Sequence, residues 1–328
     1  MNASYDKTAA VVVLPPLSGG RLQDTSLRTW LARSNLSMDP EPRDLLARIV
    51  EAVGLPHPRE GLGALRMWGQ TGDRPTVWIA AADPVYLEPR LDHLCLHAPR
   101  RIGVPPADLR ALVDHLQSVL GDEQSIGFTR LGSSGYLRAD KPIASAAVPA
   151  YVIDQRVPSD FLPDGEGAAS YRNLISEIEM ALHDHDVNLR RVAAGKCPIN
   201  SLWLWGGGKA PGREMRPQPP LYANDPLLLG YWESATAVAE LWPGNIEHCV
   251  DASDGGFVAV MPEFENDSAA VQDCLQALHS ALRARRFARL TLLFRDGLRA
   301  DIERSHAWRF WRRESELLDF ATTEHGGS

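Results

Sequence analysis

Cysteine is scarce in this chain of 328 residues, which contains four, and no two of them form a C-x-x-C pair. Their spacing matches neither a structural zinc site nor a disulfide framework. We therefore expect buried, unpaired thiols in a reducing compartment, and hence a cytoplasmic protein. The four are Cys95, Cys197, Cys249 and Cys274.

Long hydrophobic runs and an excess of positive charge are also missing. No stretch reaches the roughly 20 apolar residues of a transmembrane helix, and the apolar segment at 11–14 is too short for a signal-peptide core. Lysine and arginine total 34 against 42 acidic residues, a net charge of −8. This balance argues against a generic surface for nucleic acid or anionic membrane. We expect neither partner.

One segment runs against that charge balance. Residues 306–313, HAWRFWRR, interleave Trp308, Phe310 and Trp311 with arginines, a pattern that can stack on nucleic-acid bases. In an acidic chain we interpret it instead as a strand whose arginine stems lie along its aromatic rings.

Several common catalytic motifs are absent. The sequence has no G-x-G-x-x-G opening a helix, no P-loop and no G-x-S-x-G. Their absence argues against the dinucleotide-binding, P-loop and serine-hydrolase classes. The tetrapeptide GSSG at 132–135 fits a hairpin turn better than a nucleophile site.

What is present is an alternation of strand and helix patterns, which predicts an α/β core, and a length that suggests about two domains. A buried strand ends at Leu14 before two prolines, and two helical patterns follow by residue 55. Residues 76–140 predict a compact α+β unit. It consists of a strand, turn and strand at 76–99, with turn signals at Asp83-Pro84 and Glu88-Pro89, then a helix at 105–121 and a hairpin. Near the C-terminus, Asp296-Gly297 predicts an antiparallel edge hairpin.

The sequence HDHD at 183–186 is a weak candidate for a metal site. Histidine and aspartate are good metal ligands, and His183 and Asp186 would share one face of a predicted helix at 169–195. The alternative is a solvated helix end, where histidine is favoured by the helix dipole. The candidate ligands are His183, Asp184, His185 and Asp186.

The segment 195–212 combines Trp203 and Trp205 with three consecutive glycines. Glycine lets backbone N–H groups approach a phosphate closely, so Gly206, Gly207 and Gly208 are candidates for a phosphate cradle. The alternative is a tight connection after a buried strand that the tryptophans anchor.

A longer pattern, N-x2-R-x3-G-x4-N-x2-W-x-W-G-x-G-x2-P, contains this segment. It resembles a segment of archaeal-type, cofactor-independent phosphoglycerate mutases of the alkaline phosphatase superfamily, and the α+β unit resembles their inserted module. The chain is also similar to a bacterial phosphoglycerate-mutase-like group associated by name with a regulator of pathogenicity factors. The pattern is carried by Asn188, Arg191, Gly195, Asn200, Trp203, Trp205, Gly206, Gly208 and Pro211.

This resemblance implies an alkaline-phosphatase-like α/β core, truncated or degenerate, formed by residues 1–75 and 141–328, with an inserted α+β module at 76–140. It also implies two divalent metals and a serine nucleophile, but the family's first strand ends in a metal-binding aspartate where this chain has Leu14-Pro15-Pro16. The carboxylates at 251–265 include no Asp-His pairing. A two-metal site that lacks several ligands should not clamp a phosphoryl group.

We therefore predict a degenerate, non-catalytic phosphoglycerate-mutase-like protein that binds or responds to a phosphorylated or carboxylated metabolite, without a cofactor. By the resemblance, Arg191 would pair with the acid group, Asn188 and Asn200 would orient it, and the glycines at 206–208 would lie beside it. One alternative is an active phosphoglycerate mutase or phosphatase with Mn or Zn held at 183–186. Another is a protein-interaction module without a small-molecule site.

Overall fold

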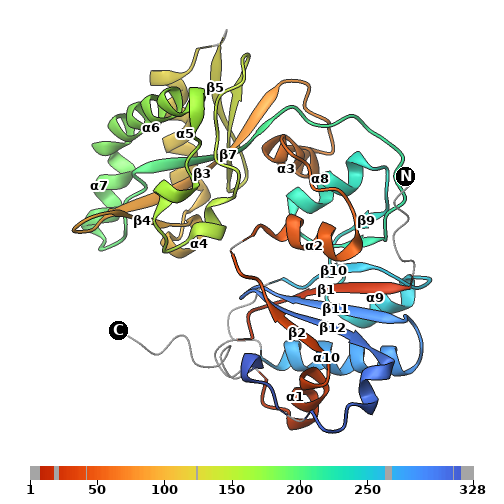
Figure 1. Cartoon of the computed structure of the whole chain (residues 1–328). Coiled ribbons are helices and arrows are strands. Elements are labelled where there is room, and N and C mark those ends of the chain that lie inside the picture. Colours follow the sequence, from red (N-terminus) through yellow and green to blue (C-terminus); the bar gives the residue numbers. More distant parts are fainter. Residues whose placement is uncertain are drawn as a thin grey trace. The chain divides into compact units, whose positions relative to one another are not determined.

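The computed structural model describes residues 8–17, 22–41, 43–122, 125–262, 268–312 and 314–318. Its contacts divide the chain into two compact units (Figure 1). Unit 1 comprises residues 1–57, 213–225 and 232–328, and unit 2 comprises residues 58–212 and 226–231. The helix α8 (Pro226–Ser234) begins in unit 2 and ends in unit 1.

Unit 1 is built on a mixed sheet with the strand order β2-β12-β11-β1-β10-β8-β9. From β11 to β9 neighbouring strands are parallel, whereas β12 and β2 are added antiparallel at one edge. The strands are β1 (Ala9–Leu14), β2 (Asn35–Met38), β8 (Leu221–Tyr222), β9 (Ala239–Glu240), β10 (Val258–Val260), β11 (Arg289–Phe294) and β12 (Leu298–Glu303).

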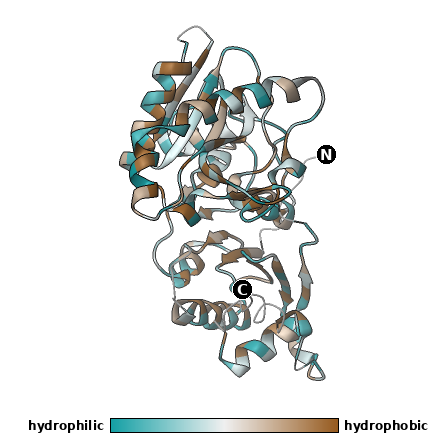
Figure 2. Ribbon diagram, turned by 90° about the vertical axis from the view of Figure 1, so that its left-hand side faces the viewer, coloured by the Kyte–Doolittle hydropathy of each residue, from teal (hydrophilic) through white to brown (hydrophobic). Residues whose placement is uncertain are grey.

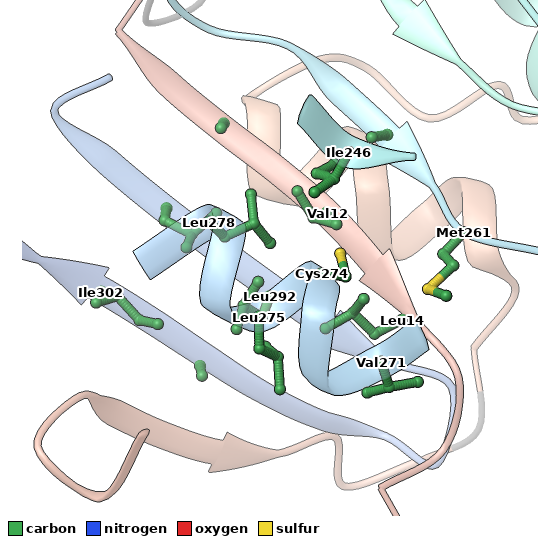
Figure 3. Close-up of a cluster of buried hydrophobic side chains, with 14 of the residues drawn as sticks. Val12, Leu14, Ile246, Met261, Val271, Cys274, Leu275, Leu278, Leu292 and Ile302 are labelled. Atoms are coloured by element: carbon green, nitrogen blue, oxygen red, sulfur yellow. The ribbon is translucent and has the colours of Figure 1, made fainter. Parts of the chain in front are cut away.

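Helices cover both faces of this sheet, which explains why β1 is an almost unbroken apolar run. The main core lies between one face and α1, α9 and α10, and α2 packs on β1 and β11. Figure 3 shows Leu275 and Leu278 of α10 beside Leu292 of β11. The helices are α1 (Thr25–Ala32), α2 (Leu45–Val53), α9 (Ile246–Ala252) and α10 (Ser268–Arg283).

The ends of α2 show how local sequence sets a boundary in unit 1. Asp44 is its N-cap, and its carboxylate accepts a hydrogen bond from the Ala47 N–H at 2.9 Å. Gly54 ends the helix in the left-handed conformation, which glycine adopts without strain. The helix therefore begins at Leu45 and ends at Val53.

Unit 2 contains an antiparallel sheet in which the long strand β3 is central. β3 pairs with β6 and β7 along its first part and with β4 along its last part, and β5 extends the sheet beyond β6. The strands are β3 (Trp78–Pro89), β4 (Leu94–His97), β5 (Ile126–Leu131), β6 (Ser134–Ala139) and β7 (Ser201–Gly208).

The helices of unit 2 close its core. α5 packs on β5 and α6, and α6 packs on β7, so their apolar faces meet the sheet, while α3 contacts β3 and β7. In Figure 2 these helices carry both hydrophobic and hydrophilic residues, as expected of helices with one buried face. They are α3 (Leu62–Thr71), α4 (Pro99–Ile102), α5 (Pro106–Leu120), α6 (Ala168–His183) and α7 (Asp186–Ala193), with short 3₁₀ segments at Ala150–Ile153, Pro158–Phe161 and Gly165–Gly167.

Unit 2 is larger than the module that sequence places at 76–140. It also takes in α3, α6, α7 and β7, because β7 pairs with β3 from Ile79 to Val85 and the α6 face completes the core. The expected break at Asp83-Pro84 is wrong, because β3 continues through both residues. Their pairing with β7 keeps the strand extended.

Three further expectations are corrected. The helix expected at 169–195 is two helices. The described part of the segment expected as a strand, 306–312, is not a strand but the end of a 3₁₀ helix (Arg304–Trp308) followed by a turn, and position 313 lies outside the described residues. The segment's aromatic rings are exposed, with 79% of Trp308 and 68% of Trp311 open to solvent. All four cysteines are free, but Cys197 is exposed, not buried. Among the residues described here, no helix has the length and apolar character to cross a membrane.

Candidate functional site

Arg191 of α7 is a buried hydrogen-bonding centre, with only 4% of its surface exposed. Its guanidinium donates to the carbonyls of Ile102 (2.7 Å) and Gly103 (2.9 Å), and its Nε donates to the Cys197 carbonyl at 2.9 Å. Nη1 also lies 3.3 Å from Oδ2 of Asp108. Ile102 and Gly103 stand at the C-terminal end of α4, where carbonyls lack partners within the helix and a cation is favoured.

Asn188 lies one turn before Arg191 and is equally buried. Its amide nitrogen donates to the carbonyls of Leu182 and Ile199, and its amide oxygen accepts from the Ile199 N–H, all at 2.8–2.9 Å. The side chain therefore uses both donors and an acceptor to join the end of α6 to the segment before β7.

The side-chain amide of Asn200 continues the pairing of β7 with β3 beyond the first residue of β7. Its amide oxygen accepts from the Leu87 N–H at 2.8 Å, and its amide nitrogen donates to the Leu87 carbonyl at 2.9 Å. It thus acts as a substitute for a strand residue immediately before Ser201. For Asn188, Arg191 and Asn200 the structure shows structural contacts, and their ligand-binding roles stay predictions.

The two tryptophans of β7 anchor the strand, as the sequence suggests. Both rings are buried, and Trp203 donates through Nε1 to the Val148 carbonyl at 2.8 Å. Trp205 donates to Oδ2 of Asp83 at 2.7 Å, and the other oxygen of Asp83 accepts from Arg66 of α3 at 2.6 Å. The Arg66 guanidinium lies 5.2 Å from the Trp205 ring centroid, a cation–π contact that ties α3 to the sheet.

The three glycines lie inside β7, not in a loop, and their close surroundings explain them. A Cβ on Gly206 would stand 2.7 Å from Cβ of Leu62, and one on Gly208 would stand 2.4 Å from the Gly61 nitrogen. The N–H of Gly206 donates to the Ala146 carbonyl, and that of Gly207 donates to Oγ of Ser145. The lack of side chains at these glycines lets the start of α3 approach β7 closely. Their role beside a phosphate stays a prediction.

The segment at 183–186 spans the break between α6 and α7. The side chains of His183 and Asp184 are 82% and 91% exposed, whereas His185 is the N-cap of α7 and accepts from the Val187 N–H through Nδ1. Burial and the neighbouring His115 lower the pKa of His185, which favours the neutral imidazole that this cap requires. Because the chain turns here, His183 and Asp186 do not share a helix face.

In unit 1 the carboxyl ends of the parallel strands form the edge at which open α/β sheets bind their ligands. β1 ends before Pro15 and Pro16, and Oδ2 of Asp296, after β11, accepts from the Leu17 N–H at 2.7 Å. The buried Arg48 donates to the Phe294 carbonyl at 2.7 Å and lies 2.5 Å from Oδ2 of Asp39. A guanidinium therefore occupies the end of β11.

The described carboxylates of the segment 251–265 do not add potential ligands to the carboxyl end of the unit 1 sheet. The Asp251 side chain is 75% exposed and pairs with Arg286 at 3.3 Å, and Asp254 is exposed. The other two, at positions 263 and 265, lie outside the described residues. A group of three potential metal ligands lies in unit 2, away from this end of the sheet. Within the described ranges, the ligand atoms of Glu88, Cys95 and His97 all lie within 4.8 Å of one another.

A pocket of about 290 Å³ opens in unit 1 at the amino ends of β1 and β11. Arg299 binds Oδ2 of Asp301 at 2.9 Å, and Oδ1 of the same carboxylate accepts from Thr291 at 2.7 Å. Burial and the neighbouring Arg309 lower the pKa of His306. The pocket's polar lining comprises Asn35, Arg289, Thr291, Arg299, Asp301, Glu303 and His306.

Sequence reasoning missed both this pocket and the Glu88 group. The pocket combines residues from β2, β11, β12 and the following 3₁₀ helix, which no motif connects. The Glu88 group had a local signal, because Cys95 and His97 alternate in the apolar strand LCLH and β3 ends at the expected Glu88-Pro89 position. Sequence alone does not give the register that places Glu88 opposite Cys95.

The fold and these contacts define an α/β protein with an appended antiparallel unit, and the α/β fold class is confirmed. No family model matches the chain. It is 31% identical over 113 residues to the "Probable 2,3-bisphosphoglycerate-independent phosphoglycerate mutase" of Geobacter sulfurreducens, covering 33% of this chain and 27% of that protein. It is 34% identical over 105 residues to the corresponding mutase of Methanosarcina acetivorans, covering 30% and 26%.

The matched part thus spans about a quarter of the length of these curated relatives. A solved cofactor-independent phosphoglycerate mutase from Thermoplasma acidophilum shows a TM-score of 0.42 at 18% identity, covering 90% of this chain and 89% of that one. The PH0037 protein of Pyrococcus horikoshii gives 0.48 at 12%, covering 99% and 100%. The resemblance to cofactor-independent phosphoglycerate mutases is confirmed, as a divergent and partial one.

Proposed function

We propose that this phosphoglycerate-mutase-like protein does not transfer phosphoryl groups through a two-metal site, and that it binds a phosphorylated or carboxylated metabolite. The observation that carries the first half is the carboxyl end of the unit 1 sheet. There, Pro15 and Pro16 follow β1, and the Arg48 guanidinium donates to the last carbonyl of β11. Phosphoryl transfer depends on metal ions that neutralise developing charge, and a fixed guanidinium at this end repels a divalent cation.

Asp296 supports the same conclusion. It is the described carboxylate that directly follows β11, and it already accepts hydrogen bonds from the backbone of Leu17 and Leu298. A carboxylate that holds the segment after β1 to the β11–β12 turn gives up those bonds if it turns to a metal. Its geometry therefore favours loop closure over ligation.

The second half of the proposal is supported by the pocket at the other end of the sheet. Arginine is the side chain best suited to carboxylates and phosphates, because its planar fork donates two parallel hydrogen bonds. Arg289, at the first position of β11, and Arg299 of β12 both line the pocket. We assign these two arginines to the acid group of the ligand.

We expect 3-phosphoglycerate or phosphoenolpyruvate to raise the Tm of the full-length protein, and Arg289→Ala to remove that rise. A ligand at about 100 times its Kd stabilises the folded state by about 2.7 kcal/mol, which a thermal-shift titration detects readily. Arg172→Ala is the matched control, since Arg172 is an exposed arginine of unit 2 and should leave the titration unchanged.

A mutase assay on the same protein with Mn²⁺ or Zn²⁺ checks the non-catalytic half. We expect no turnover above the blank. Turnover that a chelator abolishes and added metal restores would overturn the proposal and establish the active-enzyme alternative. Absence of both turnover and ligand stabilisation would favour an interaction module, consistent with the exposed Trp308, Phe310 and Trp311.

A further inference from the structure

The β3–β4 hairpin of unit 2 places three potential metal ligands on one face. Glu88 stands opposite Cys95, and Tyr86 stands opposite His97, in the antiparallel register. Residues directly opposite each other share a face, and so do residues two apart in one strand. The side chains of Glu88, Cys95 and His97 therefore project to the same side, and their ligand atoms all lie within 4.8 Å of one another.

We propose that Glu88, Cys95 and His97 form a binding site for a soft divalent transition metal, zinc above all. Thiolate, imidazole and carboxylate are the ligands that zinc uses in proteins, and the thiolate disfavours magnesium and calcium. Three protein ligands leave a fourth tetrahedral position for water or a small ligand. This site is separate from the carboxyl end of the unit 1 sheet and does not depend on the proposed function.

The ligands are graded from the core to the surface. Cys95 is 2% exposed, the His97 side chain 13% and the Glu88 side chain 36%, so the thiol is shielded while the carboxylate is reachable. The Tyr86 ring stacks on the His97 imidazole with centroids 5.6 Å apart, which restrains the plane of the imidazole. A rigid hairpin with one restrained ligand costs little entropy to organise around an ion.

A pocket borders Cys95. This pocket of about 330 Å³ is lined by Cys95 together with Arg90, His93 and Asp160, among others. Without metal, Nε2 of His97 lies 3.0 Å from Oε2 of Glu88, and Arg90 binds the same carboxylate at 3.1 Å. Metal binding replaces the His97–Glu88 hydrogen bond by two metal–ligand bonds. The imidazole proton then resides on the ring nitrogen that does not bind the metal, and the Cys95 thiol proton is released to solvent.

The adjustment that this requires is small. Bonds of about 2.0–2.3 Å to a tetrahedral zinc bring ligand atoms to roughly 3.3–3.8 Å from one another. Oε2 of Glu88 and Nε2 of His97 are already closer than that, at 3.0 Å. Metal binding therefore mainly shortens the distances from the Cys95 sulfur to these two atoms.

Cobalt(II) spectroscopy of the reduced, full-length protein tests the site directly. We expect one equivalent of Co²⁺ to produce thiolate charge-transfer absorption and the intense visible bands of tetrahedral cobalt, and Zn²⁺ to displace it. Cys95→Ser should remove the charge-transfer band. Glu88→Gln and His97→Gln should each weaken Zn²⁺ binding by at least about tenfold, since even outer-shell substitutions cost 10–100-fold.

Two matched variants separate this site from adventitious binding. Cys197→Ser removes the exposed thiol of unit 2, and His93→Asn removes a neighbouring imidazole outside the group. Both should keep the cobalt spectrum. The proposal is overturned if no charge-transfer band forms, or if Cys197→Ser abolishes it while Cys95→Ser does not. Should Cys95→Ser fail to fold, as circular dichroism would show, the Glu88 and His97 titrations decide.

Discussion

Replacing Arg191 by alanine should lower the free energy of unfolding by about 3–5 kcal/mol, the cost of breaking a buried, paired charge. The substitution leaves the carbonyls of Ile102, Gly103 and Cys197 without their donor, and Asp108 without its nearest cation in the core. The Ile102 acceptor is buried, and leaving a buried acceptor unpaired is costly because water does not reach it. Urea unfolding followed by circular dichroism and tryptophan fluorescence measures the loss.

Arg190→Ala is the matched control, because this neighbouring arginine is 66% exposed and reaches Asp108 only at 3.9 Å. Its removal should change the free energy of unfolding by less than about 1 kcal/mol, as for other exposed ion pairs. Arg191→Lys should rescue only part of the loss, since an ammonium does not span carbonyls on three sides. Unchanged stability in Arg191→Ala, together with lost ligand stabilisation, would show instead that Arg191 binds the ligand.

Elements with strong local signals were predictable from sequence. α5 and α10 follow from helical periodicity, and the β5–β6 and β11–β12 hairpins follow from turns whose glycines, Gly132 and Gly297, have positive φ. The expected C-terminal edge is wrong, however, because β2 pairs outside β12. β2 consists of NLSM, with no run of apolar or β-branched residues to mark it, and its pairing with β12 is a long-range contact.

The break between α6 and α7 shows why periodicity alone was insufficient there. Leu182 and Val187 are both buried, so the apolar pattern continues across the turn as if one helix ran through it. The N-cap of α7 is His185, and histidine is not among the residues that usually mark a helix start. The metal hypothesis at 183–186 assumed one unbroken helix and therefore no turn at this place.

The candidate site was located by pattern, but its contacts were not predictable. A single sequence does not distinguish an arginine that is buried and binds backbone carbonyls from an arginine that is exposed and binds a ligand. The distinction depends on partners such as Gly103, 88 positions away from Arg191. Resemblance therefore selected residues within 188–211 as candidates, and the fold shows that Asn188, Arg191 and Asn200 bind the protein's own backbone.

Replacing Gly206 by alanine should lower the free energy of unfolding by about 2–4 kcal/mol, from left-handed strain and overpacking together. Its φ is +61°, a conformation that costs an L-residue energy, and the new Cβ would stand 2.7 Å from Cβ of Leu62 and 3.1 Å from the Gly63 nitrogen. Neither neighbour is the end of a flexible side chain, so α3 must move away from β7. Urea unfolding with circular dichroism measures the change.

Gly212→Ala is the control within the same segment, since its Cβ would meet nothing within 4 Å and its φ is not positive. It should leave stability unchanged or raise it by about 0.4–1 kcal/mol, because alanine restricts the unfolded chain. Equal effects at Gly206 and Gly212 would show that α3 does not require the bare backbone of β7. A large loss at Gly206 alone would show that this position requires glycine for its backbone conformation and for the close approach of α3.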